Sequence, residues 1–246
     1  MLSYSHHFRN IQAQAPRTYM FVILLVGLGS VIQSALVSAQ VAPNAAEIAS
    51  YTGLHAAAQR GDVAQIQRLG TTSAVVNAPD SYDRTPLHVA TFAKQREAIR
   101  ALVKAGADLN KLEKDRYDAV TIAAVADDEE TLRVLLQLGA SAKLTTSRWD
   151  GTALIAAAHL GHDGVVRQLI QAGAPLDHVN NLHWTAAIEA VVLGKGGARH
   201  QASLKALIDA GANLKLTDRQ GQTPLQLARA RGYGEMVTML EKEEKK

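Results

Sequence analysis

Three cations in a glycine-rich segment are the residues whose types and spacing come closest to a binding chemistry. Residues 194–200 read GKGGARH, and Lys195, Arg199 and His200 could hold an anion such as a phosphate beside the glycine amides. A phosphate-binding loop, however, joins a strand to a helix and ends in Gly-Lys-Ser/Thr, and this segment has neither feature. We expect a loop extension or a partner-contact loop here, with an anion or small-ligand site at Gly194–His200 as the alternative.

Metal binding and acid–base catalysis find little support elsewhere in the chain. Gly161 breaks the helix between His159 and His162, so this pair does not have the spacing of metal ligands on one helical face. The acidic run Asp127–Glu130 lacks the spacing of a calcium loop and suits a helix start, where the dipole favours negative charge. There is no cysteine and no Gly-x-Ser-x-Gly elbow. We therefore predict no catalytic residue, no metal and no cofactor.

The composition favours closely packed helices and does not indicate a nucleic-acid partner. Hydrophobic residues make up 47% of the 246 residues but aromatic residues only 4%, which suits helices that approach through small side chains. The formal charge is +3, and two of the basic residues, Arg9 and Arg17, lie near the N-terminus. The remaining charges nearly balance. A nucleic-acid-binding protein would concentrate basic residues on one face.

Residues 1–39 have the pattern of an export signal. A polar start containing arginines precedes an apolar run from Tyr19 to Ile32, and Val37 and Ala39 place small residues at −3 and −1 of a cleavage site. We predict a signal peptide cleaved after Ala39 and a periplasmic or secreted protein. The alternative is an uncleaved signal anchor in the inner membrane facing the periplasm, because Met20–Ala39 carries no charge and is just long enough to span a bilayer.

A six-residue motif recurs six times over most of the chain. The copies begin at Thr52, Thr85, Asp118, Thr152, Thr185 and Thr223, so the spacing is 33 or 34 residues until the last interval of 38. Copies two and six, TPLHVA and TPLQLA, combine a threonine that can cap a helix with a proline at the first helical position. One copy cannot bury its own apolar face, so the stability must come from stacking of the copies.

This motif and period resemble the ankyrin-repeat family over residues 48–243. The resemblance implies an all-α solenoid of about six helix-turn-helix repeats with short β-turn fingers, behind the signal peptide. It also implies a structural role for His55 and His88 at the fourth motif position. The segments expected are a flexible mature N-terminus at 40–47, repeats at 48–80, 81–113, 114–147, 148–180, 181–218 and 219–243, and a charged tail at 244–246.

The turns between the paired helices also follow the motif, with one interruption. A glycine stands at the tenth position in four copies and is expected to adopt a left-handed conformation there: Gly61, Gly161, Gly194 and Gly232. Copy five is five residues longer than its neighbours, and the additional residues fall in the 194–200 segment. A similar insertion occurs in exported bacterial ankyrin-repeat proteins, which this chain therefore also resembles.

Motif positions eight and nine, where this family usually exposes its concave face, are apolar in the middle copies. Exposed apolar patches commonly mark interaction sites, although these side chains could instead pack against neighbouring fingers. The expected finger tips add aromatic residues and arginines, Arg84 among them, and such residues are frequent hot spots of binding. The residues predicted to contact a partner are Phe92, Tyr117, Arg148, Trp149, His159, Trp184, Val192 and Arg199.

Together these features predict a non-catalytic protein–protein interaction module, a scaffold or adaptor, that acts outside the cytoplasm as a monomer. The alternative is an accessory or inhibitor (immunity) protein that guards a periplasmic enzyme, for example in stress defence. The predicted partner is another protein and not a nucleic acid. Contact with a membrane is expected only through the leader, if the leader is uncleaved. The sequence does not identify the partner.

Overall fold

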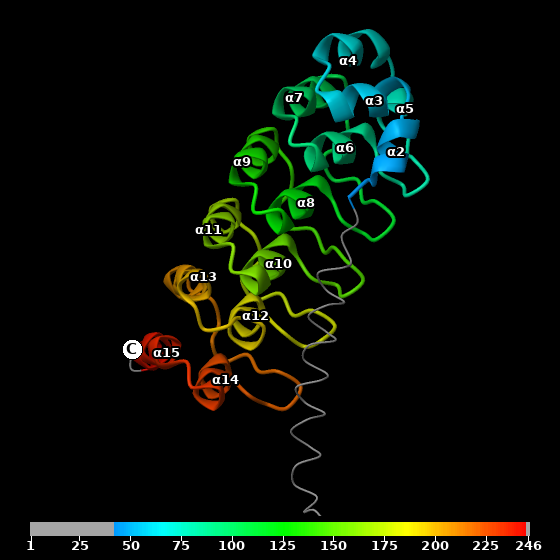
Figure 1. Ribbon diagram of the computed structural model, residues 1–246. Helices are drawn as coiled ribbons and strands as arrows, with labels where there is room; N and C mark the ends of the chain where they lie inside the picture. Colours follow the sequence, from blue (N-terminus) through cyan, green and yellow to red (C-terminus); the bar gives the residue numbers. More distant parts are fainter. Residues whose placement is uncertain (1–41, 245–246) are drawn as a thin grey trace, which may run out of the picture. The chain divides into compact units, whose positions relative to one another are not determined.

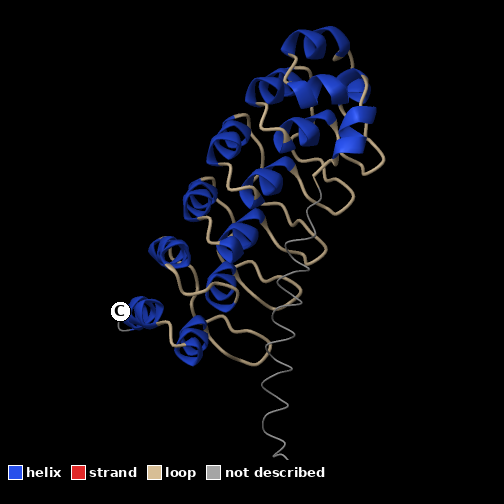
Figure 2. Ribbon diagram, in the orientation of Figure 1, coloured by secondary structure: helices blue, strands red, loops and turns tan. Residues whose placement is uncertain are grey.

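The computed structural model describes residues 42–244, all within one compact unit of the chain. The predicted signal peptide at 1–39, the start of the predicted flexible segment and the last two residues of the tail lie outside the described residues. The described part is helical and contains no strand, only an isolated bridge between Thr146 and Gly151 (Figure 2). No helix within residues 42–244 combines the length and apolar character that crossing a bilayer requires.

Each of the six motif copies forms a pair of helices. The first helices are α3 (Gly53–Arg60), α6 (Pro86–Phe92), α8 (Ala119–Val125), α10 (Ala153–Leu160), α12 (Ala186–Val192) and α14 (Pro224–Arg231). The second helices are α4 (Val63–Leu69), α7 (Arg96–Lys104), α9 (Glu129–Gln137), α11 (Asp163–Gln171), α13 (Ala198–Asp209) and α15 (Gly234–Glu244). Two further short helices, α2 (Ala45–Ser50) and α5 (Ser73–Val76), lie on either side of the first pair in the sequence.

The pairs stack so that the first helices form one row and the second helices form another (Figure 1). Each helix contacts the equivalent helix of the next pair, and one hydrophobic core runs through both rows. The alanine at the sixth motif position is almost fully buried in every copy: Ala57, Ala90, Ala123, Ala157, Ala190 and Ala228. A small side chain at this position lets neighbouring helices approach closely. The predicted all-helical stack of about six repeats is confirmed.

The predicted left-handed turn is present at three of the four glycines. Gly61, Gly161 and Gly232 have φ values of 71°, 70° and 69°. Gly194 is not among the residues with positive φ, so this part of the prediction is wrong. The insertion lengthens the linker of copy five, and there the left-handed residue is Gly196, with φ 65°. Glycine adopts this conformation at little steric cost because it has no Cβ.

The segment predicted to be flexible, 40–47, differs from the prediction because helix α2 begins within it. The Asn44 side chain accepts hydrogen bonds from the amides of Ala46 and Glu47, and the Glu47 carboxylate accepts one from the Asn44 amide. This reciprocal cap stabilises the first turn. No residue of α2 itself is buried, although Pro43 just before it is buried and Tyr51 just after it packs against the core.

Arg84 links α2 to the stack. Its guanidinium is only 1% exposed and donates to Glu47 Oε2 at 2.6 Å and to Asp80 Oδ2 at 2.8 Å. It also lies 4.6 Å from the centre of the Tyr82 ring, and the Tyr51 hydroxyl donates to the same Asp80 oxygen at 2.8 Å. The hydrogen bond from Arg84 lowers the pKa of the Glu47 carboxyl, so this acid stays charged and paired. A buried ion pair therefore ties α2 to the stack.

The histidines at the fourth motif position of copies one and two connect their repeats to the next finger, which is the structural role that the resemblance implied. His88 Nδ1 accepts from the Thr85 amide at 3.0 Å, which leaves Nε2 to donate to the Lys111 carbonyl at 3.0 Å. His55 Nε2 likewise lies 3.0 Å from the Arg84 carbonyl. His88 is 1% exposed, and burial lowers its pKa to about 4. The neutral ring is therefore the form that fits this site.

Because the unfolded chain would bind a proton at His88 with an ordinary pKa near 6.5, acid should weaken the fold at this residue. The contribution of neutral His88 is complete above about pH 6.5 and decreases as the pH falls toward 4, because only the unfolded state takes up the proton. We expect His88 alone to account for about 2 kcal/mol of lost stability between about pH 7 and pH 4.5. Urea unfolding at both pH values would measure this loss.

The matched variant is His88→Gln, because Gln226 already holds this motif position in copy six and accepts from the Thr223 amide at 2.8 Å. The variant should fold and lose less stability in acid than the wild type. Equal losses in the two proteins would show that His88 does not contribute to acid unfolding.

Candidate partner-binding surface

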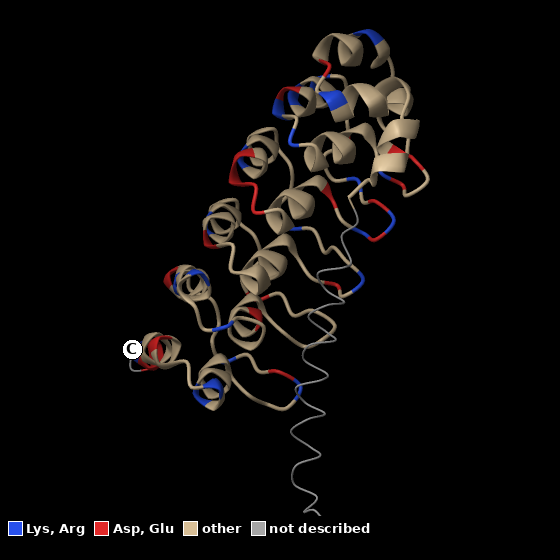
Figure 3. Cartoon of the chain, in the orientation of Figure 1, with Lys and Arg blue, Asp and Glu red and all other residues tan. Residues whose placement is uncertain are grey.

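The first helices form a face with almost no exposed charge. Their only carboxylate is Glu189, which is 2% exposed. Their exposed charged side chains are Arg60, Arg229 and Arg231, all in the two end copies, and Arg229 is paired with Glu241 at 2.7 Å. Acidic and basic residues gather instead on the second helices and the finger loops (Figure 3). The two sides of the stack therefore differ chemically.

An apolar row crosses this face at motif positions eight and nine of copies two to five. We define the apolar row as Phe92, Val125, Leu160, Val192 and Leu193, all of which are partly exposed. The helices that carry them contact one another in order, so equivalent positions fall on one side of the stack. Val192 also packs partly against the hydrophobic core. The sequence prediction of an apolar surface here is consistent with this exposure.

The finger loops that precede the first helices are braced from within. In four fingers, one polar side chain accepts hydrogen bonds from the backbone amides two and four residues later. Asn180 accepts from Leu182 and Trp184 in this way, at 3.0 Å each. Asp80, Glu113 and Asp218 make the same pair of bonds in their own fingers. Backbone bonds also join adjacent fingers. The fingers are thus held in place before any partner arrives.

The aromatic side chains of the fingers are less exposed for partner contact than the sequence predicted. Tyr117 is 6% exposed, and burial raises the pKa of its hydroxyl to about 12, so we remove it from the candidate surface. Trp184 is partly exposed and packs against the core. Trp149 is also partly exposed, although its indole nitrogen is buried with no hydrogen-bond partner in the described part of the chain. Trp184 therefore helps to hold its finger on the core, whereas Trp149 stays on the candidate surface.

The arginines of the fingers are engaged in crossed ion pairs. Arg148 lies 3.3 Å from Asp115, and Arg116 lies 3.0 Å from Asp150. The fingers that precede copies three and four are therefore joined by two ion pairs, with one arginine from each finger. All four side chains stay substantially exposed. Such pairs contribute little to stability, typically about 0–1 kcal/mol. Arg148 remains on the candidate surface, but part of its charge is already balanced.

His159, predicted to contact a partner, is instead part of a buried polar network. It is 8% exposed, and its Nδ1 lies 3.1 Å from Glu189 Oε2 on the next first helix. The Asn180 side chain donates to the other Glu189 oxygen at 3.0 Å. We therefore remove His159 from the candidate surface. The sequence analysis did not identify Glu189. Its place at motif position five, where every other copy carries an apolar residue, could have indicated a buried polar interaction.

The insertion of copy five packs against both neighbouring repeats. His200 Nε2 donates to the His159 carbonyl of copy four at 3.0 Å, and the Tyr233 hydroxyl of copy six donates to the Gly194 carbonyl at 3.0 Å. A Cβ at Gly196 would lie 2.6 Å from the Tyr233 ring. The additional residues lengthen both the linker and helix α13, which has 12 residues. The segment is therefore a structural brace.

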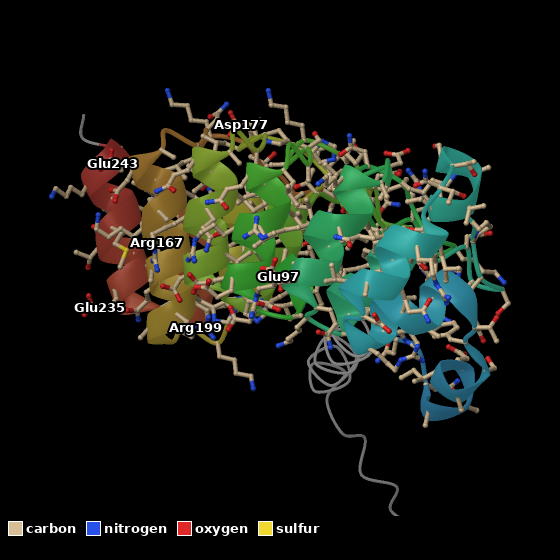
Figure 4. All side chains as sticks on the ribbon, turned by 90° about the horizontal axis from the view of Figure 1, so that it is seen from above. Glu97, Arg167, Asp177, Arg199, Glu235 and Glu243 are labelled. Atoms are coloured by element: carbon tan, nitrogen blue, oxygen red, sulfur yellow. The ribbon has the colours of Figure 1, made fainter. Side chains whose placement is uncertain are left out.

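Arg199 completes this brace. Its guanidinium lies 2.9 Å from Asp127 of copy three and 3.2 Å from Asp163 of copy four, so one side chain links three repeats. Arg199 lies at the edge of the stack opposite Asp177 (Figure 4). The hydrogen bonds that it donates to both carboxylates raise its pKa. Two of the three groups proposed for an anion site, Arg199 and His200, are thus directed at other parts of the protein.

A double-mutant cycle tests this link. We expect Arg199→Ala and Asp127→Ala to show a coupling energy of about 0.5–1 kcal/mol in urea unfolding, because the pair is half exposed and belongs to a network. High salt should reduce the coupling. The matched cycle pairs Arg133 with Glu130, which are neighbours on one helix, lie 2.7 Å apart and do not link repeats. No coupling between Arg199 and Asp127 would contradict the brace.

The histidines that could suggest a metal site have other roles. His162 Nδ1 donates to the Ala124 carbonyl at 2.9 Å, which again links two repeats. Within residues 42–244, no group of three or more His, Cys, Asp or Glu side chains is arranged to hold a metal ion. The polar residues of the turns therefore hold the stack together.

Comparison with known proteins connects this architecture to a family. A family model described as ankyrin repeats in three copies matches residues 22–113 and 120–218. The Escherichia coli K12 ankyrin repeat protein YahD is 33% identical over 186 residues, which cover 75% of this chain and 92% of YahD.

Two solved structures are also similar. A crystal structure of an ankyrin repeat domain from Acinetobacter baumannii AYE has a TM-score of 0.72 and 41% identity, covering 76% of this chain and 95% of that one. A crystal structure of another ankyrin repeat protein has a TM-score of 0.71 and 30% identity, covering 78% of this chain and 98% of that one. The likeness therefore includes nearly the whole length of each relative.

Proposed function

Because the chain belongs to the ankyrin-repeat family, we propose that it is a protein–protein interaction module that acts outside the cytoplasm as a monomer. Ankyrin repeat proteins generally bind other proteins and are generally non-catalytic scaffolds. A shared fold does not specify the function of one member, so the particular surface must carry the argument. The observation that carries it is the partly exposed apolar row on a face with almost no exposed charge.

The apolar row is suited to binding because its side chains would leave water when a partner covers them. Removing apolar surface from water is favourable by about 25 cal/mol per Å², and this gain offsets the entropic cost of association. The braced fingers beside the row would lose little conformational freedom on binding, which keeps the entropic cost low. Phe92, Val125 and Leu160 are the contacts we propose at the centre, with Arg148 and Trp149 at the finger edge.

Export is the second part of the proposal, and it is supported by residues 1–39 alone. Their basic start, apolar run and small residues before Ala39 are the features that an export pathway reads. Cell fractionation followed by N-terminal sequencing would test it. We expect the mature protein in the periplasm or medium, starting at Gln40. An intact N-terminus in the membrane fraction would favour the signal anchor, and an intact chain in the cytoplasm would contradict export.

The partner can be identified by chemical crosslinking in the native cell envelope, followed by affinity purification and mass spectrometry. We expect one protein to be enriched over a control strain that lacks the bait. If that protein is an enzyme, its activity with and without the purified chain would distinguish a scaffold from a guardian inhibitor. Absence of any enriched protein would contradict the interaction role.

A further inference from the structure

We infer that the partner presents an extended segment with apolar side chains in its middle and a carboxylate toward each end. This inference rests on the proposed function, because it concerns what covers the apolar row. The observation behind it is the position of the apolar row between two exposed arginines. The apolar row occupies positions eight and nine of copies two to five, and position nine of the two end copies is an exposed arginine, Arg60 in copy one and Arg231 in copy six.

Neither arginine has an acidic partner among residues 42–244. Arg60 has no hydrogen bond or ion pair with any described residue, and Arg231 contacts only the carbonyl of Leu227 in its own helix, at 3.4 Å. By contrast, the finger arginines Arg116 and Arg148 are balanced by aspartates. No carboxylate is exposed on the first helices themselves, since Glu189 is buried. The face is therefore apolar in its centre and positive at both ends.

The partner is expected to carry negative charge near its ends because both arginines lose water when it binds. A partner that covers the apolar row and extends over both end copies would remove water from Arg60 and Arg231. A cation that loses water without gaining an acidic partner is destabilised, whereas a carboxylate placed opposite restores the lost interaction. A segment with basic ends would be repelled for the same reason, so the arginines also select against wrong partners.

The repeat spacing sets the length of the segment. Neighbouring packed helices lie about 8–10 Å apart, so the five steps between copies one and six span roughly 40–50 Å. An extended chain advances about 3.3 Å per residue and would need roughly 12–15 residues between its carboxylates. A helix would need about 30 residues for the same span, because it rises only 1.5 Å per residue. An extended segment is therefore the shortest occupant that reaches both arginines.

The test uses the full chain, kept in mild detergent so that the leader is retained. A phage-displayed library of random peptides about 20 residues long, enough to span the row when extended, is selected on the wild type and on the variant R60E/R231E. The control variant K104E/K242E makes the same change in net charge on second helices, where both lysines are exposed. Melting curves verify that all three proteins are folded.

We expect peptides selected on the wild type and on K104E/K242E to have apolar centres and Asp or Glu toward both ends. The R60E/R231E variant should select Lys or Arg at those positions instead, and should bind the best wild-type peptide at least about tenfold more weakly. Binders without acidic ends, or unchanged preferences on R60E/R231E, would overturn this inference while leaving the interaction role intact. If no peptide is enriched over bare beads, both the inference and the proposed function are contradicted.

Discussion

Replacing Arg84 by methionine should release helix α2 from the stack and lower the free energy of unfolding by about 3 kcal/mol. The substitution keeps most of the side-chain volume but removes the guanidinium that pairs with Glu47 and Asp80. Breaking a buried ion pair from one side typically costs about 3–5 kcal/mol, because the partner charge is left without compensation. We place the effect at the lower end because Glu47 and Asp80 retain some exposure, 18% and 10%.

Hydrogen exchange distinguishes this local release from general unfolding. Since α2 buries no residue of its own, its amides should lose protection in Arg84→Met while those of α10, near the middle of the stack, keep theirs. Arg84→Lys is the matched control: it retains the charge but not the fork that reaches both carboxylates, and should lose protection only in part. Unchanged protection of Ala45–Ser50 in Arg84→Met would show that something other than this ion pair holds the helix.

Placing two carboxylates in the apolar row should weaken partner binding at least about 100-fold without unfolding the protein. In Val125→Asp/Leu160→Asp, each new charge would be buried by the partner with no hydrogen-bond donor or cation provided for it, whereas in the free protein both positions are partly exposed to water. We therefore expect the stability to fall far less than the affinity. Calorimetric titration with the partner recovered from the envelope, or with the best selected peptide, would measure the loss.

The control for this prediction adds the same two charges elsewhere. Gln137 and Gln171 are exposed at the ends of second helices, and Gln137→Asp/Gln171→Asp should bind as the wild type does. If both double variants weaken binding equally, the effect reflects net charge alone. If neither does, the partner does not use the apolar row.

The repeat architecture was predictable because every copy needs the same few side chains for the same reasons. A cap, an apolar residue at the third position and a small alanine at the sixth recur wherever a first helix must pack between two others. The pattern therefore survives in copy three, which has lost its threonine, proline and histidine. What the copies share could be read from the sequence, whereas the sequence left open whether the apolar side chains at positions eight and nine are exposed or packed.

The contacts that single residues make across the stack were not predictable in the same way. Arg84 sits at an expected finger tip, but its side chain turns inward to Glu47, 37 residues away in a segment without a repeat motif. Arg199 reaches Asp127 over 72 residues, although the sequence did show that copy five was extended. These pairings depend on how the stacked copies bring distant residues together, and no local pattern encodes them.

The sequence analysis placed His159 and Tyr117 on the surface because of their positions in the repeat and their residue types. Both are buried in the structure, so both assignments were wrong. In copy four the residue at position eight turns toward a carboxylate on the neighbouring helix, so its polarity is satisfied inside the protein. Tyr117 illustrates the same limit, since a finger residue can face either the partner or the core. The candidate site became narrower as a result: an apolar row with an arginine beyond each end.

Site-specific photocrosslinking in living cells tests the central claim most directly. A photoreactive amino acid is placed at Val125 in the apolar row, or at Gln137 on the second helix of the same repeat, and the adducts are compared after illumination. We predict that position 125 forms a covalent adduct with another envelope protein and that position 137 does not. An adduct from position 137 but not from 125, or none from either position, would contradict the claim that this protein binds its partner through the first-helix face.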